Sequence, residues 1–372
     1  MSMVQAEQAL QEALSAYDFG GTVESTSRFG EGHINDTFRV DARRPDGSVC
    51  RSILQRVSPV AFKEPDKLME NIVNVTEHLS REITRLGGDP TRETLSVLRT
   101  RDGAASVTDS TGGVWRAFPF VEGTVCYQSA ETPELFAASG RAFGRFQRLL
   151  GDYPAQTLHE TIPNFHNTED RLQKFKAVLA ADPLGRAKDC GPEIQFVLDR
   201  EADCSVALNA MREGTLPLRV THNDTKLNNV LMDEKTHEGL CIIDLDTVMP
   251  GLVIYDFGDS IRFGANHSAE DERDLSKVNL DVELFSAYTA AFLEGAGGSL
   301  TNEEIDYLPW GAKLMTLECG IRFLTDYIDG DHYFHISREA QNLDRCRTQF
   351  KLVADMESRW AELEAIVKQY RK

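Results

Sequence analysis

The amino-acid sequence predicts an α+β fold of two lobes: a small N-terminal lobe with an antiparallel sheet and a larger, mainly helical C-terminal lobe. Strand-like runs separated by tight turns fill residues 23–101, whereas helical periodicity dominates after residue 132. The composition changes at the loop Glu122-Gly123. With 372 residues and 41% apolar content, the chain is also long enough for two lobes. We therefore expect an N-terminal lobe over residues 1–122 and a C-terminal lobe over residues 123–372.

The N-terminal lobe is expected to contain four strands and one helix. The segment Gly30-Glu-Gly-His-Ile-Asn35 is typical of a hairpin turn between the first two strands, and Pro45-Asp-Gly47 is typical of a second tight turn. A helix is predicted over residues 65–86, because apolar side chains recur there at helical spacing. The strands are predicted at residues 22–29, 36–41, 50–57 and 114–121.

The C-terminal lobe is expected to be built from helices. Thr132-Pro133 is a good N-cap and first helical residue, and Gly151 is a natural stop for the helix that follows. Further helices are predicted at residues 169–181, 193–212, 282–293, 310–327 and 341–370.

Charge and composition exclude several classes of partner. The formal charge is −19, from 59 acidic and 40 basic residues, so the chain as a whole repels nucleic acid and anionic membranes. No run approaches the roughly 20 apolar residues of a membrane span, and the N-terminus lacks a basic region followed by an apolar one. The seven cysteines are scattered, without a Cys-x-x-Cys pair. We expect a cytoplasmic protein with incidental thiols and no nucleic-acid or membrane partner.

The residues that indicate chemistry lie between positions 219 and 261. His222-Asn-Asp224 is followed by Asn229, and Asp244 follows an apolar run. Phosphoryl transfer from a nucleoside triphosphate needs such a set: Asp224 would orient the attacking hydroxyl and accept its proton, and Asn229 and Asp244 would hold magnesium. The alternative is that these are capping and turn residues, which are often Asp or Asn. Asp246 lies on the same side of an extended chain as Asp244 and is a further candidate metal ligand.

Two motifs resemble a known superfamily. Val220-Thr-His-Asn-Asp-Thr-Lys-Leu-Asn-Asn229, followed by Ile242-Ile-Asp244, is similar to the aminoglycoside phosphotransferase and choline kinase superfamily of small-molecule kinases. The likeness extends from Gly30 to Phe323 and is greatest to the N-acetylhexosamine 1-kinases of that superfamily. It implies a bilobal protein-kinase-like fold, ATP as co-substrate and Mg²⁺ as cofactor, with Asp224 as catalytic base and Asn229 and Asp244 as metal ligands.

Asp256-Phe-Gly258 spells the metal motif of protein kinases but lies too far along the chain for that role. The metal-binding aspartate of a protein kinase follows the catalytic one by about twenty residues, which suits Asp244. Asp256 and Asp259 are therefore predicted to hold the catalytic loop through hydrogen bonds.

The nucleotide is expected to bind in the N-terminal lobe. Gly30 and Gly32 occupy the place of a glycine-rich phosphate loop, although a lone Gly-x-Gly is often only a hairpin turn. The resemblance implies a phosphate-contacting lysine where this chain has Gln55. Either Arg56 or a cation from elsewhere substitutes for it, or the nucleotide is held more weakly by backbone groups and metal. Phe118 and Phe120 would line the adenine pocket, although a buried core strand would look the same.

The acceptor is expected to bind near residues 318–334. Glu318, Arg322 and Asp326 recur at four-residue spacing on one helix face, where they form either a solvated ion-pair ladder or the wall of a cleft. The resemblance implies that Arg322 and Tyr333 contact a sugar, and that His33 donates to an acetamido or hydroxyl oxygen.

The motifs predict a kinase, and the resemblance implies an anomeric one. It would transfer the γ-phosphoryl group of ATP to O1 of N-acetylglucosamine (GlcNAc) or N-acetylgalactosamine (GalNAc), giving the sugar 1-phosphate. Two alternatives stay open. One is a kinase for another hydroxyl acceptor, such as homoserine, choline or an aminoglycoside; the other is a nucleotide-binding protein that has lost catalysis.

Overall fold

The computed structural model describes residues 3–30, 34–130 and 132–372, and its fold is mixed α+β, as predicted. The chain divides into two compact units. Unit 1 comprises Met1–Val125, Thr157–Pro163 and Leu240–Met249, and unit 2 comprises Cys126–Gln156, Asn164–Gly239 and Pro250–Lys372. The first stretch of unit 1 ends close to the expected lobe boundary, but two later segments rejoin it.

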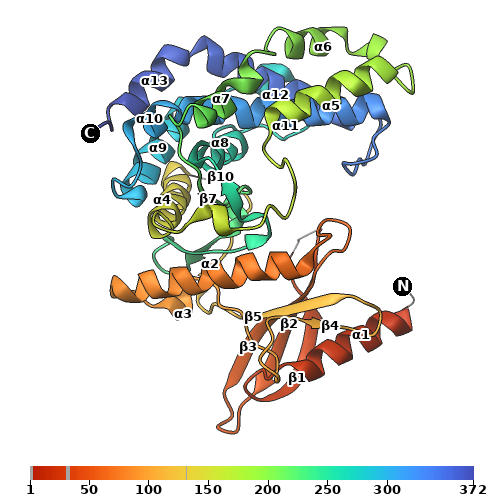
Figure 1. The fold of residues 1–372 in the computed structure, drawn as a ribbon, viewed down its shortest axis with the longest axis vertical. Helices are drawn as coiled ribbons and strands as arrows, with labels where there is room; N and C mark the ends of the chain where they lie inside the picture. Colours follow the sequence, from red (N-terminus) through yellow and green to blue (C-terminus); the bar gives the residue numbers. More distant parts are fainter. Residues whose placement is uncertain (1–2, 31–33, 131) are drawn as a thin grey trace. The chain divides into compact units, whose positions relative to one another are not determined.

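Unit 1 is built on a five-stranded antiparallel sheet in the order β1-β2-β3-β5-β4 (Figure 1). All four predicted strands are present, and a short strand, β4, adds to them at the edge. Arg116 in β5 lies directly opposite Gln55 in β3, and Ala117 lies opposite Leu54. The strands are β1 Thr22–Arg28, β2 Asp36–Arg43, β3 Val49–Arg56, β4 Val107–Thr108 and β5 Val114–Pro119.

One face of this sheet is covered by helix α1 (Met3–Ala16), which the sequence analysis did not predict. Ala9 and Ala13 of the helix pack with Leu54 and Trp115 of the sheet in one buried cluster. Side chains alternate along a strand, so Gln55 and Arg116 project to the opposite face. The face opposite α1 therefore carries the polar side chains of β3 and β5.

Helix α2 (Pro65–Arg85) begins with proline at its first turn and buries a stripe of apolar side chains, as predicted. It also carries a buried amide, Asn71, that joins the three segments of unit 1. Its Nδ2 donates to the carbonyl oxygens of His159 (2.8 Å) and Val248 (3.2 Å), and its Oδ1 accepts from the His159 N–H (2.9 Å). The short helix α3 (Pro90–Glu93) follows.

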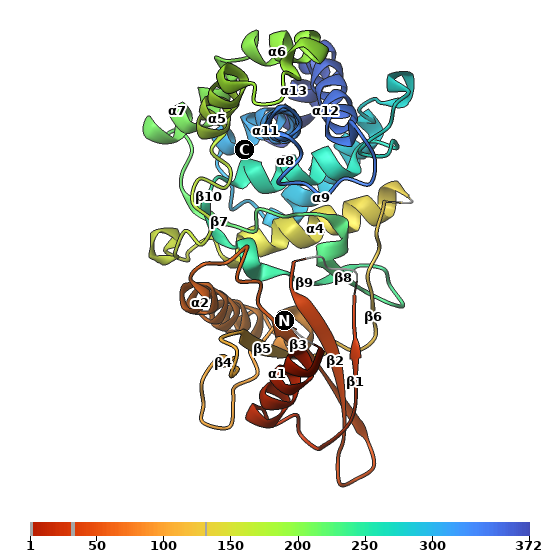
Figure 2. The same ribbon diagram turned by 90° about the vertical axis from the view of Figure 1, so that its right-hand side faces the viewer.

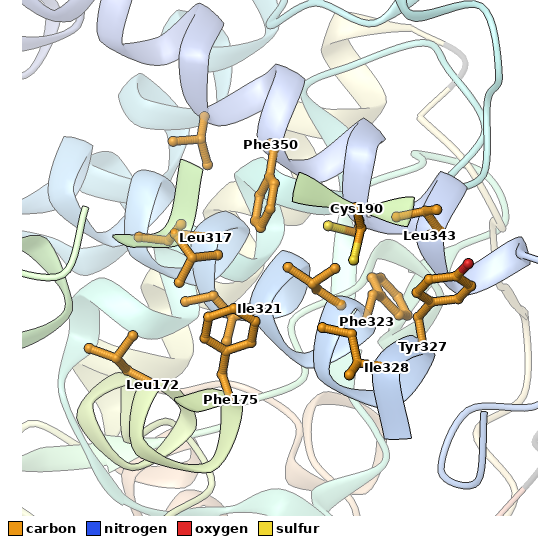
Figure 3. Packing of buried hydrophobic residues seen from close by; sticks show 14 of the residues in the cluster. Leu172, Phe175, Cys190, Leu317, Ile321, Phe323, Tyr327, Ile328, Leu343 and Phe350 are labelled. Carbon is orange, nitrogen blue, oxygen red and sulfur yellow. The ribbon is translucent and has the colours of Figure 1, made fainter. Parts of the chain in front are cut away.

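Unit 2 is mainly helical, and α11 (Leu308–Asp329) packs against α5, α8 and α12 (Figure 2). Helices α8 and α11 approach closely, since a Cβ added at Gly258 would lie 2.1 Å from the carbonyl oxygen of Gly311. The core between α5, α11 and α12 contains Phe175, Leu317 and Phe350 (Figure 3). The other helices are α4 Pro133–Leu149, α5 Thr168–Ala181, α6 Gly191–Leu198, α7 Val206–Arg212, α8 Val253–Gly264, α9 Val282–Ala296, α10 Asn302–Asp306, α12 Gln341–Ser358 and α13 Trp360–Lys368.

Two predicted helices are each interrupted. Residues 193–212 form α6 and α7 instead of one helix, and Arg200 in the interruption makes an ion pair with Glu357 of α12 (2.6 Å). Residues 341–370 form α12 and α13, with the break at Arg359; Trp360 then packs edge-on against Trp310 of α11 (5.0 Å between ring centroids). In both places tertiary contacts outweigh a continuous helical pattern.

Short strands complete the chain: β6 Thr124–Val125, β7 Arg219–Thr221, β8 Val230–Asp233, β9 Gly239–Ile242 and β10 Met249–Gly251. All seven cysteines lie within the described residues, and none of them forms a disulfide bond. Within the described ranges, none of the helices has the length and apolar character that crossing a membrane requires.

Candidate active site

The predicted catalytic loop follows β7 in unit 2 and is fixed by a buried carboxylate. Asp256 of α8 is fully buried and accepts the backbone N–H groups of His222 (2.9 Å) and Asn223 (2.8 Å), and Gln147 Nε2 also donates to it (2.8 Å). Asn223 has a φ of +66°, a left-handed conformation that Asn tolerates better than most residues. The prediction that Asp256 holds this loop is confirmed.

Asp259, one turn later on α8, holds the other side of the loop. Its Oδ2 accepts the N–H of Thr225 (2.9 Å), and its Oδ1 pairs with Arg262 (2.9 Å), so its predicted role is also confirmed. The pKa values of the two carboxylates shift in opposite directions. Burial raises the pKa of Asp256; burial acts in the same sense on Asp259, but the charges of Arg262 and Lys226 outweigh it and lower the pKa of Asp259.

Asp224 stands at the surface of the loop with its carboxylate oriented by two neighbours. Asn229 Nδ2 donates to Asp224 Oδ2 (3.1 Å) and to its carbonyl oxygen (2.8 Å), and Lys226 Nζ lies 2.8 Å from Oδ1. Burial alone would lower the pKa of Lys226, but the charges of Asp224 and Asp259 raise it. A partly exposed carboxylate that is oriented by an amide N–H donor and a nearby cation suits a base that receives a proton next to a transferred phosphate.

His166, which the sequence analysis did not single out, contacts this loop from the segment before α5. Its Nε2 lies 3.1 Å from the carbonyl oxygen of Asn223 and its Nδ1 lies 3.0 Å from Glu318 Oε1. Thr168 Oγ1 donates to the other oxygen of Glu318 (2.8 Å). Glu318 is therefore a partner of the loop-holding histidine and not part of a solvated ion-pair ladder.

Two arginines lie near Glu318 at the expected acceptor site. Burial and the positive charge of Arg322 lower the pKa of Arg171, so the two guanidinium groups interact electrostatically. Arg171 Nη2 donates to the carbonyl oxygen of Phe165 (2.9 Å), whereas its buried Nε has no hydrogen-bond partner among the residues that the structure describes. Arg322 Nη2 is 3.5 Å from the hydroxyl of Tyr333, so the structure brings together the two residues expected to contact a sugar.

The loop that carries Tyr333 is held by Asp326 at the end of α11. Asp326 Oδ1 accepts the N–H groups of His332 (2.9 Å) and Tyr333 (2.8 Å), and Oδ2 accepts that of Phe334 (2.9 Å). Three backbone donors on one buried carboxylate fix the loop, while the side chain of Tyr333 is 73% exposed. Tyr333 is thus presented to solvent on a rigid backbone.

In unit 1, Asp244 and Asp246 lie in one turn after β9 but in different environments. Asp244 is exposed and has a φ of +58°, whereas Asp246 is buried. Both carboxylate oxygens of Asp246 are engaged: Oδ2 accepts from Asn35 Nδ2 (2.7 Å), and Oδ1 lies 2.5 Å from Arg116 Nη1. Asp244 is therefore better placed to ligate a metal than Asp246.

Arg56 lies on the other face of β3 from Gln55. Its Nε is 3.3 Å from Asp109 and its Nη2 donates to Thr111 (2.9 Å), so it holds the turn between β4 and β5. The cation beside Gln55 is instead Arg116, whose Nε donates to Gln55 Oε1 (3.0 Å).

The remaining nucleotide-site predictions concern residues after β1 and the strand β5. Gly30 has a φ of +76°, a conformation that favours glycine, and among the described residues beyond its chain neighbours no atom lies within 4 Å of a Cβ added there. Gly32 and His33 fall outside the described residues. Phe118 is buried, and the guanidinium carbon of Arg116 lies over its ring, 5.4 Å from the ring centroid. Phe120 packs edge-on against Phe29, with 5.7 Å between the ring centroids.

A magnesium ion fits the donor types at the predicted metal positions. Asn229 Nδ2 is used on Asp224, which leaves Oδ1 as the metal-binding atom, and Asp244 offers an exposed carboxylate. Asn229 belongs to unit 2 and Asp244 to unit 1. Across the described ranges, no group of three or more His, Cys, Asp or Glu side chains forms a metal cage. Mg²⁺ commonly binds through one or two protein ligands together with substrate phosphates.

Comparisons with known proteins identify the family and support the fold. Residues 25–290 match the model of the phosphotransferase enzyme family. Among solved structures, an aminoglycoside phosphotransferase from Alicyclobacillus acidocaldarius is 15% identical, with 97% of this chain and 96% of that chain covered and a TM-score of 0.59. An amicoumacin kinase in complex with AMP-PNP, Ca²⁺ and Ami is 13% identical (98% and 93% covered, TM-score 0.54). A choline kinase from Cryptosporidium parvum is 11% identical (94% and 92% covered, TM-score 0.53).

Proposed function

The chain belongs to the phosphotransferase enzyme family and is a small-molecule phosphotransferase, and from this we propose that it is an ATP-dependent N-acetylhexosamine 1-kinase. The γ-phosphoryl group of ATP would pass to O1 of GlcNAc or GalNAc, giving the sugar 1-phosphate, ADP and a proton. ATP as co-substrate would place the enzyme in the cytoplasm.

The two guanidinium groups beside Glu318 are the observation that carries this proposal. Thr168 of α5 donates to Glu318 of α11 (2.8 Å), and Arg171 and Arg322 each lie one helical turn further along these two helices. A guanidinium presents only hydrogen-bond donors, which suit the hydroxyl and acetamido oxygens of a sugar. The positive charges of the two groups would repel choline, an aminoglycoside or another cationic acceptor. The nearby carboxylate of Glu318 is not available to an ammonium group, because His166 and Thr168 already engage both of its oxygens.

Tyr333 supports the same substrate class. Its ring is exposed and stands next to Arg322, whose guanidinium carbon is 5.7 Å from the ring centroid. An aromatic face with a hydroxyl at its edge offers both an apolar surface for the sugar ring and a hydrogen bond for a hydroxyl group. His33, as a donor to the acetamido oxygen, remains part of the proposal on the strength of the sequence resemblance.

The chemical step would use few protein groups. Asp224 would align the O1 hydroxyl for in-line attack and take its proton as the new O–P bond forms and the bond to ADP breaks. Asn229 would keep the Asp224 carboxylate oriented, and Lys226 would add positive charge beside it. Magnesium, held by Asn229 and Asp244, would neutralise the phosphate charge. Asp246 is proposed to hold the Asp244 turn through Asn35 and Arg116 and not to ligate the metal itself.

An acceptor panel tests the proposal. ADP release is measured with ATP and Mg²⁺ and one of six acceptors: GlcNAc, GalNAc, methyl N-acetylglucosaminide, choline, homoserine or kanamycin. We expect release with the two free sugars and none with the methyl glycoside, whose O1 is blocked. Release that persists with the methyl glycoside would refute anomeric transfer, and release with only a cationic acceptor would overturn the sugar assignment. ATP binding without turnover on any acceptor would instead indicate a nucleotide-binding protein that has lost catalysis.

A further inference from the structure

We propose that Arg116 is the residue of unit 1 that contacts the nucleotide phosphates, at the place where Gln55 brings no charge. This inference rests on the proposed function, because it takes ATP as the co-substrate. It assigns a binding role to a β5 residue that was expected only to be part of a core strand or an adenine-pocket wall.

The position of Arg116 follows from strand pairing. Arg116 and Gln55 are direct partners in the antiparallel pair of β3 and β5, so their side chains leave the same face of the sheet. Gln55 is oriented by Thr37, to which its Nε2 donates (3.1 Å), and its Oε1 then accepts from Arg116 Nε (3.0 Å). The amide of Gln55 therefore points the guanidinium along this face.

Arg116 has donors beyond those that its neighbours in unit 1 use. Its side chain is 2% exposed, and among the described residues it forms one ion pair, in which Nη1 lies 2.5 Å from Asp246 Oδ1. Its Nε donates to Gln55 Oε1 (3.0 Å). Burying such an ion pair costs desolvation free energy, so the pair is a poor device for stability alone. The ion pair and the hydrogen bond use two of the five N–H donors of a guanidinium, and a bound phosphate would accept from others.

The surroundings of Arg116 fit a polyphosphate. Its partner Asp246 is two residues from Asp244, the proposed metal ligand, and accepts a hydrogen bond from Asn35, the residue before β2 (2.7 Å). A guanidinium offers five donors in a planar fork that matches phosphate oxygens. The formal charge of −19 opposes a nucleoside triphosphate, so a site for one needs such a local cation.

Other arginines on these strands are already used elsewhere. Arg56 faces the β4–β5 turn and pairs with Asp109, and Arg51 pairs with Glu122 (2.9 Å). A lysine at position 55 would stand directly opposite Arg116, and like charges directly opposite in an antiparallel pair destabilise it. Gln55 and Arg116 therefore act together: Arg116 of β5 supplies the positive charge, and the amide of Gln55 in β3 orients it.

A charge exchange tests the inference. Calorimetric affinities for ADP and for adenosine, both with Mg²⁺, are compared for the full-length wild type, Arg116→Gln, the exchange variant Gln55→Lys/Arg116→Gln, and Arg56→Gln. We expect Arg116→Gln to weaken ADP binding by about tenfold to about 100-fold and to leave adenosine binding unchanged, because only ADP carries phosphates. The exchange variant should regain most of the loss, and Arg56→Gln should bind both ligands like the wild type.

Folding and nucleotide effects are separated by two further variants. Arg116→Gln/Asp246→Asn removes the carboxylate that Arg116→Gln would leave unpaired in the interior, and Arg99→Gln removes a surface charge that pairs with Glu77 (2.9 Å). If Arg116→Gln and the double variant weaken ADP and adenosine binding equally, or if Arg56→Gln is the variant that loses ADP selectivity, the inference is overturned. A wild type that binds neither ligand would instead refute the proposed function.

Discussion

His166 and Glu318 form a nearly buried pair that fixes the residue before the proposed catalytic base. Glu318 Oε1 is 3.0 Å from Nδ1 of the imidazole, and Nε2 lies 3.1 Å from the carbonyl oxygen of Asn223. A carbonyl oxygen only accepts, so Nε2 must carry a hydrogen. With Glu318 ionised, Nδ1 also donates, and the histidine is an imidazolium whose charge holds the loop in place.

This pair predicts a pH dependence of stability. Burial alone would lower the pKa of His166, but the hydrogen bond and charge of Glu318 raise it, and Asp259 adds to that effect. The stabilisation is therefore fully present below the unfolded-state value of about 6.5 and is lost as pH rises through the higher folded value. We expect the melting temperature of the wild type to fall as pH rises through the folded-state pKa of His166. In His166→Gln, this alkaline part of the melting-temperature curve should be flatter.

The charged and titratable groups near His166 are Glu318 and Arg322 of α11, Arg171 of α5, and Asp259 and Tyr255 of α8. The matched control is His267→Gln, since His267 is exposed and pairs with Asp281 at 2.8 Å. An alkaline limb that is unchanged in His166→Gln but absent in His267→Gln would contradict the assignment.

Asp326 is predicted to control acceptor binding through the backbone of the Tyr333 loop. Asp326→Asn replaces one accepting oxygen with an amide group, so at least one of the three backbone N–H groups loses its partner, at a cost of about 1–3 kcal/mol. Steady-state kinetics should show a higher KM for the sugar and an unchanged KM for ATP. Thr325→Ala, on the same helix end but bonded only to Ile321, is the control, and an equal rise of both KM values would argue against this role.

The conformation of the catalytic loop is predicted to depend more on Asp256 than on any other single side chain. Asp256→Ala leaves the N–H groups of His222 and Asn223 buried without acceptors, at about 1–3 kcal/mol each. Urea unfolding should show this loss, and kcat should fall in the folded fraction. The control Asp199→Asn, at an exposed residue, should change stability by less than about 0.5 kcal/mol. A similar small change in Asp256→Ala would mean that the loop is held by other contacts.

The arginine pair predicts how acceptor selectivity can be altered. Arg171→Met removes one positive charge and keeps much of the apolar volume, so a cationic acceptor or inhibitor should gain affinity while the KM for GlcNAc rises by about tenfold. Competition by choline and kanamycin against GlcNAc measures the change. If neither cation competes better in Arg171→Met than in the wild type, the charge argument for a neutral acceptor is wrong.

Many helices and strands could be predicted from the sequence, because the patterns that specify them lie within short segments of the chain. The strands of unit 1, the proline starts of α2 and α4, and the loop-holding roles of Asp256 and Asp259 all follow from spacing and capping. Helix α1 was missed because its residues lack a sharp turn signal, and its helical form depends on packing of Ala9 and Ala13 on the sheet. The breaks near Arg200 and Arg359 depend on partners more than 40 residues away, such as Glu357 and Trp310.

Candidate site residues could be proposed where several of them stand in one short motif. They were missed where their position depends on contacts between segments distant in the sequence. Asp224, Asn229 and Asp244 stand in two short runs, whereas His166 contacts Glu318 across 152 positions. Arg116 could be connected with Gln55 only after the strand register was known, since that register decides which side chains share a face. Alternation along β3 did carry one usable signal, because it places Arg56 on the face opposite Gln55.

The most direct test of the central claim is phosphorus NMR of the purified protein with ATP, Mg²⁺ and GlcNAc, run in parallel with Asp224→Asn. The account predicts an anomeric phosphate resonance coupled to the sugar H1 as ADP accumulates with the wild type, and almost none with the folded variant. Turnover that survives in Asp224→Asn, or a phosphate resonance coupled to any proton other than H1, would contradict it.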